Sequence, residues 1–390
     1  MMEQKSSTNH LAYVDSIRAL AALYVVIHHM HPYVDKNLSP ALFKVFVSPF
    51  NYGHQAVDLF IVLSGYLLFL PIVKRPEKAF DIKMFYVKRI TRILPPYFAV
   101  LIISVLLVNN VFGGPSGVQL TSSPVSLWTI LSHVFLIQDI ANTSNNVNYV
   151  LWSISVEWRI YMFFPFLIWL FRKYNKVIVA LSLTTISALA MIAAKAAGWY
   201  TSFNGISLHF FGLFALGMLA AQYGFSSNSK GKFLFKKAPF YLLLTLCLVI
   251  AFVLNKGTYF GDLSYMVSDV FLGFAVALLM AGLTLGRSRQ LLSVLQYKPL
   301  ATVGLAAYSI YLIHAPVLEL INIIVMSKLS INPTMNLAVY YTLGFIAVML
   351  ASFLFYKLFE QSSIMLTKKV SKAFDDKTGK IVKPVVLNAK

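Results

Sequence analysis

The sequence is short of cysteine and short of charge, and both shortages narrow the kind of protein that it encodes. Its one cysteine, Cys247, lies in an apolar run, which excludes an internal disulfide and any metal site built from cysteines. Charged residues make up only 12% of the 390 residues, whereas 58% are hydrophobic. A soluble domain of this length does not have such a composition, so we predict an all-α, polytopic membrane protein.

Acidic residues are scarcer than basic ones: 14 Asp and Glu stand against 33 Lys and Arg, a net charge of +19. Long apolar runs recur along the whole chain, and each is long enough for a membrane-spanning helix. The predicted spans are residues 11–30, 56–73, 96–112, 157–171, 177–195, 207–222, 239–254, 264–284, 300–323 and 337–357.

The basic residues are distributed unevenly between the segments that connect these spans. With the N-terminus placed inside, 26 of the 33 Lys and Arg residues fall in inner segments and five in outer segments. Such a bias follows the positive-inside rule, so we expect about ten transmembrane helices with both termini cytoplasmic. Membrane topology and anionic lipids therefore explain the net charge, and nucleic acid is not an expected partner.

Residues 125–138 are apolar but short, and counting them as a span would move basic residues to the outer side. We predict a re-entrant or interfacial helix there. The polar, uncharged stretch 142–148 is interpreted as a loop, with the lining of a path for a hydroxyl-rich substrate as the alternative.

We divide the chain into a transmembrane domain, residues 1–360, and a basic cytoplasmic tail, residues 361–390. We expect no cleaved signal peptide.

Ionisable side chains inside the predicted spans are candidate functional residues, because their burial in a membrane is costly. Arg18 and His29 lie eleven residues apart in the first span. Eleven residues make nearly three whole helical turns, so both side chains share one face, with Arg18 in the inner half and His29 near the outer end. The neighbouring His28 is rotated by about 100° and fits less well. A purely structural polar pair is the alternative.

Two further segments carry candidate groups. Lys88, Arg89 and Arg92 cluster at the cytoplasmic start of the third span, where the two arginines share a helix face and can bind phosphate. Ordinary topology anchors are the alternative for this cluster. Ser64 and Gly65 lie within the second span, where close helix packing is favoured over a nucleophilic serine.

Acidic and aromatic residues near the outer side complete the set. Asp58 lies near the outer end of its span, where it orients a histidine or faces water. Glu157 lies at the outer start of the fourth span, with Trp152 at the level of the membrane interface, and it can pair with Arg159 or with the ionisable residues of the first span. His314, in the ninth span, is interpreted as a hydrogen-bonded structural group.

Together these segments resemble the membrane acyltransferase-3 family, whose members transfer acyl groups from acyl-CoA to hydroxyls of bacterial surface sugars and related acceptors. The resemblance covers about 350 residues in order along the chain. Its motifs are D-x-x-R at 15–18, an arginine-x10-histidine spacing that ends at His29, VDLFIVLSGY, F-x-x-K-R-x-x-R-I-x-P-x-Y at 85–97, W-S-x-S-V-E at 152–157, YSIYLIHAP at 308–316 and FE at 359–360. The residues after Glu157 depart from the family, which more often has a second acidic residue or a glutamine followed by an aromatic.

The resemblance implies roles for individual residues. His29 is expected to be the histidine required for transfer, with Arg18 and Glu157 as further catalytic residues. Acyl-CoA is expected to bind Lys88, Arg89, Arg92 and Arg18. Residues expected to support the site are Asp15, Asp58, Ser64, Gly65, Trp152, Tyr311 and His314.

The sequence therefore predicts an O-acyltransferase of the bacterial cytoplasmic membrane, with acetyl-CoA as the preferred donor and a histidine as general base. The expected partners are acyl-CoA, a carbohydrate or lipid-linked glycan acceptor and membrane lipids; no metal is expected, and a homodimer is left open. The alternatives are a proton-coupled transporter of a sugar-like or acyl compound and an inactive scaffold. The absence of an internal repeat argues against a transporter, and the intact set of ionisable residues argues against a scaffold.

Overall fold

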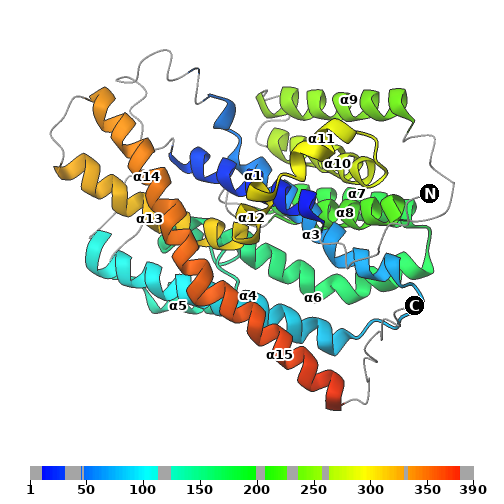
Figure 1. The fold of residues 1–390 in the computed structure, drawn as a ribbon, viewed down its shortest axis with the longest axis horizontal. Helices are drawn as coiled ribbons and strands as arrows, with labels where there is room; N and C mark the ends of the chain where they lie inside the picture. The colour runs from blue at the N-terminus through cyan, green and yellow to red at the C-terminus, as the bar shows by residue number, and fades with distance from the viewer. Residues whose placement is uncertain are drawn as a thin grey trace, which may run out of the picture.

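The computed structural model describes residues 11–30, 45, 48–112, 124–198, 207–225, 236–256, 263–328 and 333–377, and this part of the chain is helical without a strand. Most long helices lie side by side, and α14 and α15 cross them as one diagonal column (Figure 1). The long helices are α1 (Ala12–Met30), α3 (Gly53–Lys74), α4 (Ile82–Leu107), α6 (Trp152–Lys173), α7 (Lys176–Ala196), α8 (Phe210–Phe225), α9 (Lys237–Lys256), α10 (Ser264–Thr284), α13 (Ala307–Lys328), α14 (Pro333–Phe355) and α15 (Gln361–Lys377).

Shorter helical elements connect the long helices. Two are π-helical turns that continue α4 and α14, and the others cap or link spans. They are the 3-10 turns η2 (Ser48–Phe50), η4 (Ser144–Asn146) and η5 (Tyr149–Leu151), the α-helices α5 (Leu127–Val134), α11 (Arg289–Leu295) and α12 (Lys298–Leu305), and the π-helical η3 (Val108–Phe112) and η7 (Tyr356–Glu360).

Eight helical segments of the described chain are long and apolar enough to cross a membrane. They fall on eight of the ten predicted spans, so the all-helical architecture with many candidate spans is confirmed. The other two predicted spans correspond to α1, which has 19 residues and two charged side chains, and to α8, which has 16 residues. The total of ten crossings and the cytoplasmic position of both termini stay predictions.

Two predicted spans differ from the structure. The third span was expected from residue 96, but α4 begins at Ile82, where the Asp81 side chain accepts a hydrogen bond from the Met84 N–H at 3.0 Å and caps the helix. The helix then continues through Pro95 and Pro96. The ninth span is divided, since α12 ends at Leu305 and α13 begins at Ala307. Helix α5 has only eight residues, about 12 Å of helix, which is too short for a crossing.

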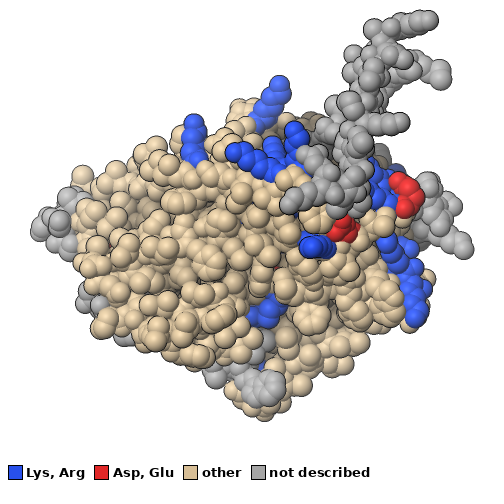
Figure 2. Space-filling view, turned by 90° about the horizontal axis from the view of Figure 1, so that it is seen from below, with Lys and Arg blue, Asp and Glu red and all other residues tan. Residues whose placement is uncertain are grey.

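The outer surface of the bundle is largely apolar. Figure 2 shows a broad face made mostly of uncharged residues, and most of the lysines and arginines in view gather toward its edges. Large apolar side chains are exposed on the outer helices, including Ile102, Phe166, Leu189, Leu242 and Phe353. A surface of this kind is expected to face lipid.

Small residues allow α3 and α8 to pack closely. A Cβ atom at Gly65 would lie 2.1 Å from the carbonyl oxygen of Phe214, and one at Gly217 would lie 2.0 Å from that of Val62. Backbone therefore meets backbone in both directions across this contact. The packing interpretation of Gly65 agrees with this geometry.

Residues 361–377, which the sequence analysis assigns to a tail, form α15 and pack against α4. The hydroxyl groups of Thr91 and Thr367 lie 2.9 Å apart, and the ammonium of Lys83 lies 5.9 Å from the centre of the Phe374 ring. Residues 378–390 of the predicted tail lie outside the described residues.

Candidate active site

A cavity of about 360 Å³ lies between α1, α3, α4, α6, the start of α13 and η7. Its ionisable lining residues are Arg18, Arg89, Arg92, Glu157 and Glu360. Segments that are far apart in the sequence thus bring together four residues predicted to act in catalysis or donor binding. Three guanidinium groups and two carboxyl groups give the lining a positive balance, which favours an anionic ligand.

Arg89 is the most enclosed of the three arginines. Its guanidinium carbon lies 5.9 Å from the centres of both the Phe85 and Tyr161 rings, and the group also interacts electrostatically with Glu157 and Arg92. Among the described residues, nothing accepts a hydrogen bond from its Nε atom. A buried donor without an acceptor is costly, so this N–H is well placed for an anion that enters the cavity.

Ser64 and Glu157 are linked through one tyrosine. The hydroxyl of Ser64 lies 2.6 Å from that of Tyr161, and the Tyr161 hydroxyl donates a short hydrogen bond to Oε1 of Glu157. Glu157 does not pair with Arg159, whose guanidinium instead binds Asp139, with Nη1 3.0 Å from Oδ1. The partner of Ser64 is thus a tyrosine, and a nucleophilic role for this serine gains no support.

Arg18 reaches the cavity with help from its own helix. Asp15 lies one turn before it on α1, and its Oδ1 is 3.6 Å from Nη1 of Arg18. Lys88 lies on α4 beside Arg89 but is not among the residues that line the cavity. The structure therefore separates the predicted basic cluster into two arginines inside the cavity and a lysine outside it.

His29 lies next to His314 rather than on the cavity wall. Its Nδ1 atom is 2.9 Å from Nε2 of His314, and the two rings are stacked with centres 5.1 Å apart. Tyr311 connects this pair to the cavity: it lines the cavity, and its ring centre is 5.8 Å from that of His314. The hydroxyl of Tyr311 is held by Ser153 at 2.7 Å. His29 and His314, which form the stacked pair, are 285 positions apart in the sequence.

The hydrogen bonds of His314 fix its tautomer and, through it, that of His29. Nδ1 of His314 lies 2.7 Å from the carbonyl oxygen of Tyr311 and 3.1 Å from that of Ile310. A carbonyl oxygen only accepts, so Nδ1 of His314 carries the proton and, in a neutral ring, Nε2 is an acceptor. Nδ1–H of His29 then donates to that atom, and the lone pair of His29 lies on Nε2.

Two other predicted supporting residues, Asp58 and Trp152, lie in a different place. The Asp58 side chain is fully buried, so the interpretation that it faces water is wrong. Trp152 stacks on the ring of His54, with ring centres 5.5 Å apart and planes within 4°. Both residues belong to the surroundings of a histidine and aspartate cluster that the sequence analysis did not identify.

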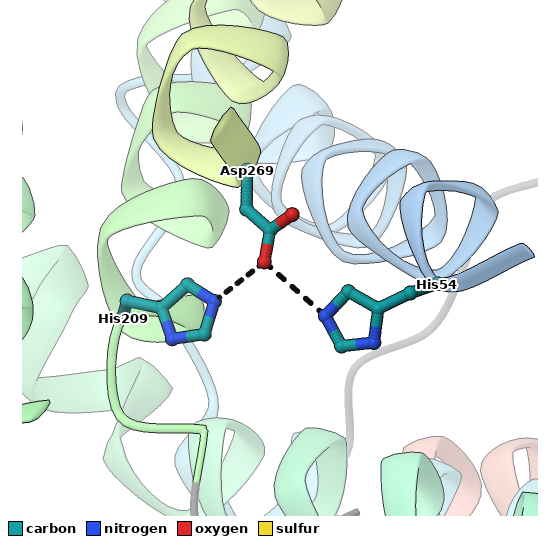
Figure 3. Close-up of side chains that lie close together, drawn as sticks. All are labelled: His54, His209 and Asp269. Carbon is teal, nitrogen blue, oxygen red and sulfur yellow. Dashed lines mark hydrogen bonds and ion pairs between the residues drawn. The ribbon is translucent and has the colours of Figure 1, made fainter. Parts of the chain in front are cut away.

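This cluster consists of His54, His209 and Asp269 (Figure 3). Nε2 of His54 lies 3.2 Å from Oδ2 of Asp269, and Nε2 of His209 lies 3.1 Å from the same oxygen. One sequence signal was available: His54 and Asp58 are four residues apart and share a helix face. The long-range partners His209 and Asp269 carried no pattern that linked them.

Tyr161 and Glu360 also line the cavity, although the set of candidate residues omitted them. Tyr161 lies four residues after Glu157 on α6, so the helical spacing could have indicated it. Glu360 was noted only as part of a terminal motif. Its Oε2 accepts hydrogen bonds from the backbone N–H of Ser309, at 3.1 Å, and from the Ser309 hydroxyl.

Comparisons with known proteins agree with the motifs. A family model described as an acyltransferase domain matches residues 11–357. The chain is 25% identical to the peptidoglycan O-acetyltransferase OatA of Listeria monocytogenes over 341 residues, which are 80% of this chain and 50% of the relative. It is 28% identical to the putative peptidoglycan O-acetyltransferase YrhL of Bacillus subtilis over 337 residues, again 80% of this chain and 50% of the relative.

The chain is also similar to the regulator of hypoxia-inducible factor 1 of Caenorhabditis elegans. The two are 26% identical over 218 residues, which are 52% of this chain and 42% of that protein. No solved structure matches the chain. The chain spans about half the length of the curated relatives it matches. Because the family model matches residues 11–357, nearly the whole chain, the chain belongs to the acyltransferase-3 family.

Proposed function

We propose that this protein is a membrane O-acyltransferase that moves an acetyl group from cytoplasmic acetyl-CoA to a hydroxyl group of a carbohydrate or glycoconjugate. Family membership and the names of the two bacterial relatives support this class of reaction. The observation that carries the proposal is the cavity in which Arg18, Arg89 and Arg92 meet Glu157, next to a hydrogen-bonded pair of histidines.

The donor enters from the side of the basic residues. A cavity of about 360 Å³ is at the small end of ligand sites, so we place the pantetheine arm inside it and the thioester at the end lined by Tyr311, next to the histidine pair. Arg89 and Arg92 bind the phosphate groups through charge-assisted hydrogen bonds, and Lys88 lies outside the cavity near the nucleotide. Arg18 lies farther along, where it stabilises negative charge on the thioester oxygen.

His29 acts on the acceptor. Its Nε2 atom removes the proton from the attacking hydroxyl as the hydroxyl oxygen bonds to the thioester carbon. The carbon–sulfur bond then breaks, the acetyl ester forms, and the proton held by His29 passes to the sulfur of the departing coenzyme A. His314 positions His29, because the hydrogen bond to Nε2 of His314 keeps the proton of His29 on Nδ1.

Glu157 serves the donor side in this proposal. It accepts a hydrogen bond from Tyr161, and both interact with the guanidinium of Arg89. Removal of its charge is therefore expected to disturb the arginine that binds the donor. The two relatives are named for peptidoglycan, so a glycan of the bacterial cell envelope is the first acceptor to test, with the enzyme in the cytoplasmic membrane.

Purified full-length protein in lipid nanodiscs with labelled acetyl-CoA provides the test. The variant His29→Ala is expected to lower the rate of acetyl transfer at least about 100-fold, the usual contribution of a general base. The double variant Arg89→Ala with Arg92→Ala is expected to raise KM for acetyl-CoA at least about tenfold, since each charge-assisted bond contributes about 1.5–3 kcal/mol.

Arg172→Ala is the matched arginine control, because Arg172 lies at the end of α6 and outside the cavity. Its KM is expected to stay at the wild-type value. Normal transfer by the His29→Ala variant would refute the assigned base. A wild-type protein that neither binds nor consumes acetyl-CoA would refute the proposed enzymatic activity and favour a transporter or a scaffold.

A further inference from the structure

Three ionisable side chains meet between α3, α10 and the residue before α8, outside the cavity of the proposed active site. They are His54, His209 and Asp269, which point toward one another with ligand atoms within 4.8 Å (Figure 3). A fourth, Asp58, lies beside this group, one helical turn after His54 on α3. Its carboxyl group interacts electrostatically with that of Asp269.

The cluster is shielded from solvent. His209 and Asp58 have exposed fractions of 0%, Asp269 has 1%, and the His54 side chain has 10%. Within the described residues, neither carboxyl oxygen of Asp58 has a hydrogen-bond partner. The ion pairs of Asp269 are made with the two histidines, and no lysine or arginine of the described chain joins them.

Charge balance at this place requires a positive ion or protons. Two carboxylates that face each other in an apolar interior repel, and each buried charge costs several kcal/mol unless it is compensated. With both imidazoles neutral, the four side chains carry a charge of −2. One divalent cation between them neutralises that charge and gives the Asp58 carboxylate a partner to bind.

We propose that His54, His209, Asp269 and Asp58 bind a divalent transition-metal ion of the zinc class. Two imidazole nitrogens and two carboxylate oxygens form a ligand set that Zn²⁺ accepts in tetrahedral geometry. With bonds of about 2.0–2.2 Å, neighbouring ligand atoms of a tetrahedron are about 3.3–3.6 Å apart. The observed separations of 3.2 and 3.1 Å therefore need only a slight spreading to admit the ion.

The ion would have a structural role. Four protein ligands complete a tetrahedral site, and closed sites of this kind stabilise folds rather than activate water. It joins the beginning of α3, the residue before α8 and the first turns of α10, three segments far apart in the sequence. It also supports the cavity wall, because Val57 next to Asp58 and Ser153 next to Trp152 both line the cavity.

The metal content of the full-length protein tests the site directly. Protein purified in detergent without chelators is expected to contain about one zinc ion per chain, measured by inductively coupled plasma mass spectrometry. The variant Asp269→Asn, which keeps the size of the side chain, is expected to lose that ion. His133→Gln is the matched control, because His133 is a fully buried histidine of α5 outside the cluster, and its metal content is expected to match the wild type.

Thermal unfolding gives a second readout that does not depend on activity. After removal of metal with a chelator, addition of Zn²⁺ is expected to raise Tm of the wild type and to leave Tm of Asp269→Asn unchanged, with Mg²⁺ as the negative control. If Asp269→Asn does not fold, Asp58→Asn carries the test: loss of the fourth ligand is expected to weaken zinc affinity at least tenfold in competition with a coloured chelator.

Two results would overturn the proposal. One is a wild-type protein that contains no stoichiometric metal and whose stripped form does not respond to Zn²⁺ or Co²⁺. The other is an Asp58→Asn variant that holds zinc as tightly as the wild type. The first result would leave a histidine and aspartate cluster that shares protons, and the second would remove Asp58 from the ligand set. Neither would affect the proposed acetyl transfer.

Discussion

His314 determines which nitrogen of His29 carries the lone pair. Its own Nδ1–H is held by two backbone carbonyl groups, so it offers only a lone pair to His29. Sequence reasoning treated His314 as a structural histidine because an isolated histidine in an apolar helix is usually satisfied locally. The contact with His29 joins α1 to α13, and no periodicity within either helix indicates it.

Replacement of His314 tests whether this side chain positions His29 or only fills space. In His314→Leu, His29 loses its acceptor, so both tautomers become populated. The transfer rate is expected to fall about 10- to 100-fold, less than the roughly 100- to 10,000-fold that loss of a general base itself typically costs. KM for acetyl-CoA is expected to stay near the wild-type value, since the donor-binding arginines are untouched. Steady-state kinetics across pH measure both quantities.

His314→Gln is the control for this prediction. A glutamine can present its amide oxygen to Nδ1–H of His29, so partial recovery of the rate and of the wild-type pH profile is expected. A His314→Leu variant with full activity and an unchanged pH profile would show that His314 does not position the base.

Helices are the scale at which the sequence was most informative. Apolar runs indicated every long membrane helix, because burial in lipid requires nearly continuous apolar residues. They missed the first fourteen residues of α4, between Ile82 and residue 96, because four basic residues interrupt the apolar run there. They also missed the break between α12 and α13, where no proline or glycine stands at Ala306 to indicate it.

The contact between α3 and α8 is expected to be intolerant of added volume. Gly65→Ala would place a methyl group 2.1 Å from a backbone oxygen of α8, so the two helices must separate. Overpacking of this kind typically costs about 1–3 kcal/mol. A clear fall in Tm is therefore expected in thermal unfolding of the purified protein.

Gly344→Ala on α14 is the matched control, because its new methyl group would meet the ends of flexible side chains, with Met30 Cε at 3.1 Å and Leu318 Cδ2 at 3.3 Å. Its effect on Tm is expected to be smaller. Equal effects of the two alanine variants would show that the close approach at Gly65 does not limit stability.

The whole molecule joins distant segments in ways that its sequence patterns do not encode. Arg18, Arg89, Arg92 and Glu157 stand out singly, because each is an ionisable group in or beside an apolar run. That they share one cavity is a property of the tertiary fold. The same holds for His54 on α3, His209 just before α8 and Asp269 on α10, which lie far apart in the sequence and were therefore missed.

The predicted orientation in the membrane is open to a direct test in whole cells. In a Cys247→Ala background, Glu77→Cys lies in a predicted inner segment and Asn142→Cys in a predicted outer one; both positions are exposed in the structure. A maleimide that cannot cross membranes is expected to label Asn142→Cys in intact cells and Glu77→Cys only after lysis. The reverse pattern would place the N-terminus outside.

The walls of the cavity come from both ends of the described chain, Arg18 on the first helix and Glu360 on η7. Every segment from α1 to η7 must therefore be synthesised before the cavity is complete. A nascent chain that has not reached Glu360 lacks part of the cavity wall, so it cannot enclose a ligand as the folded chain can.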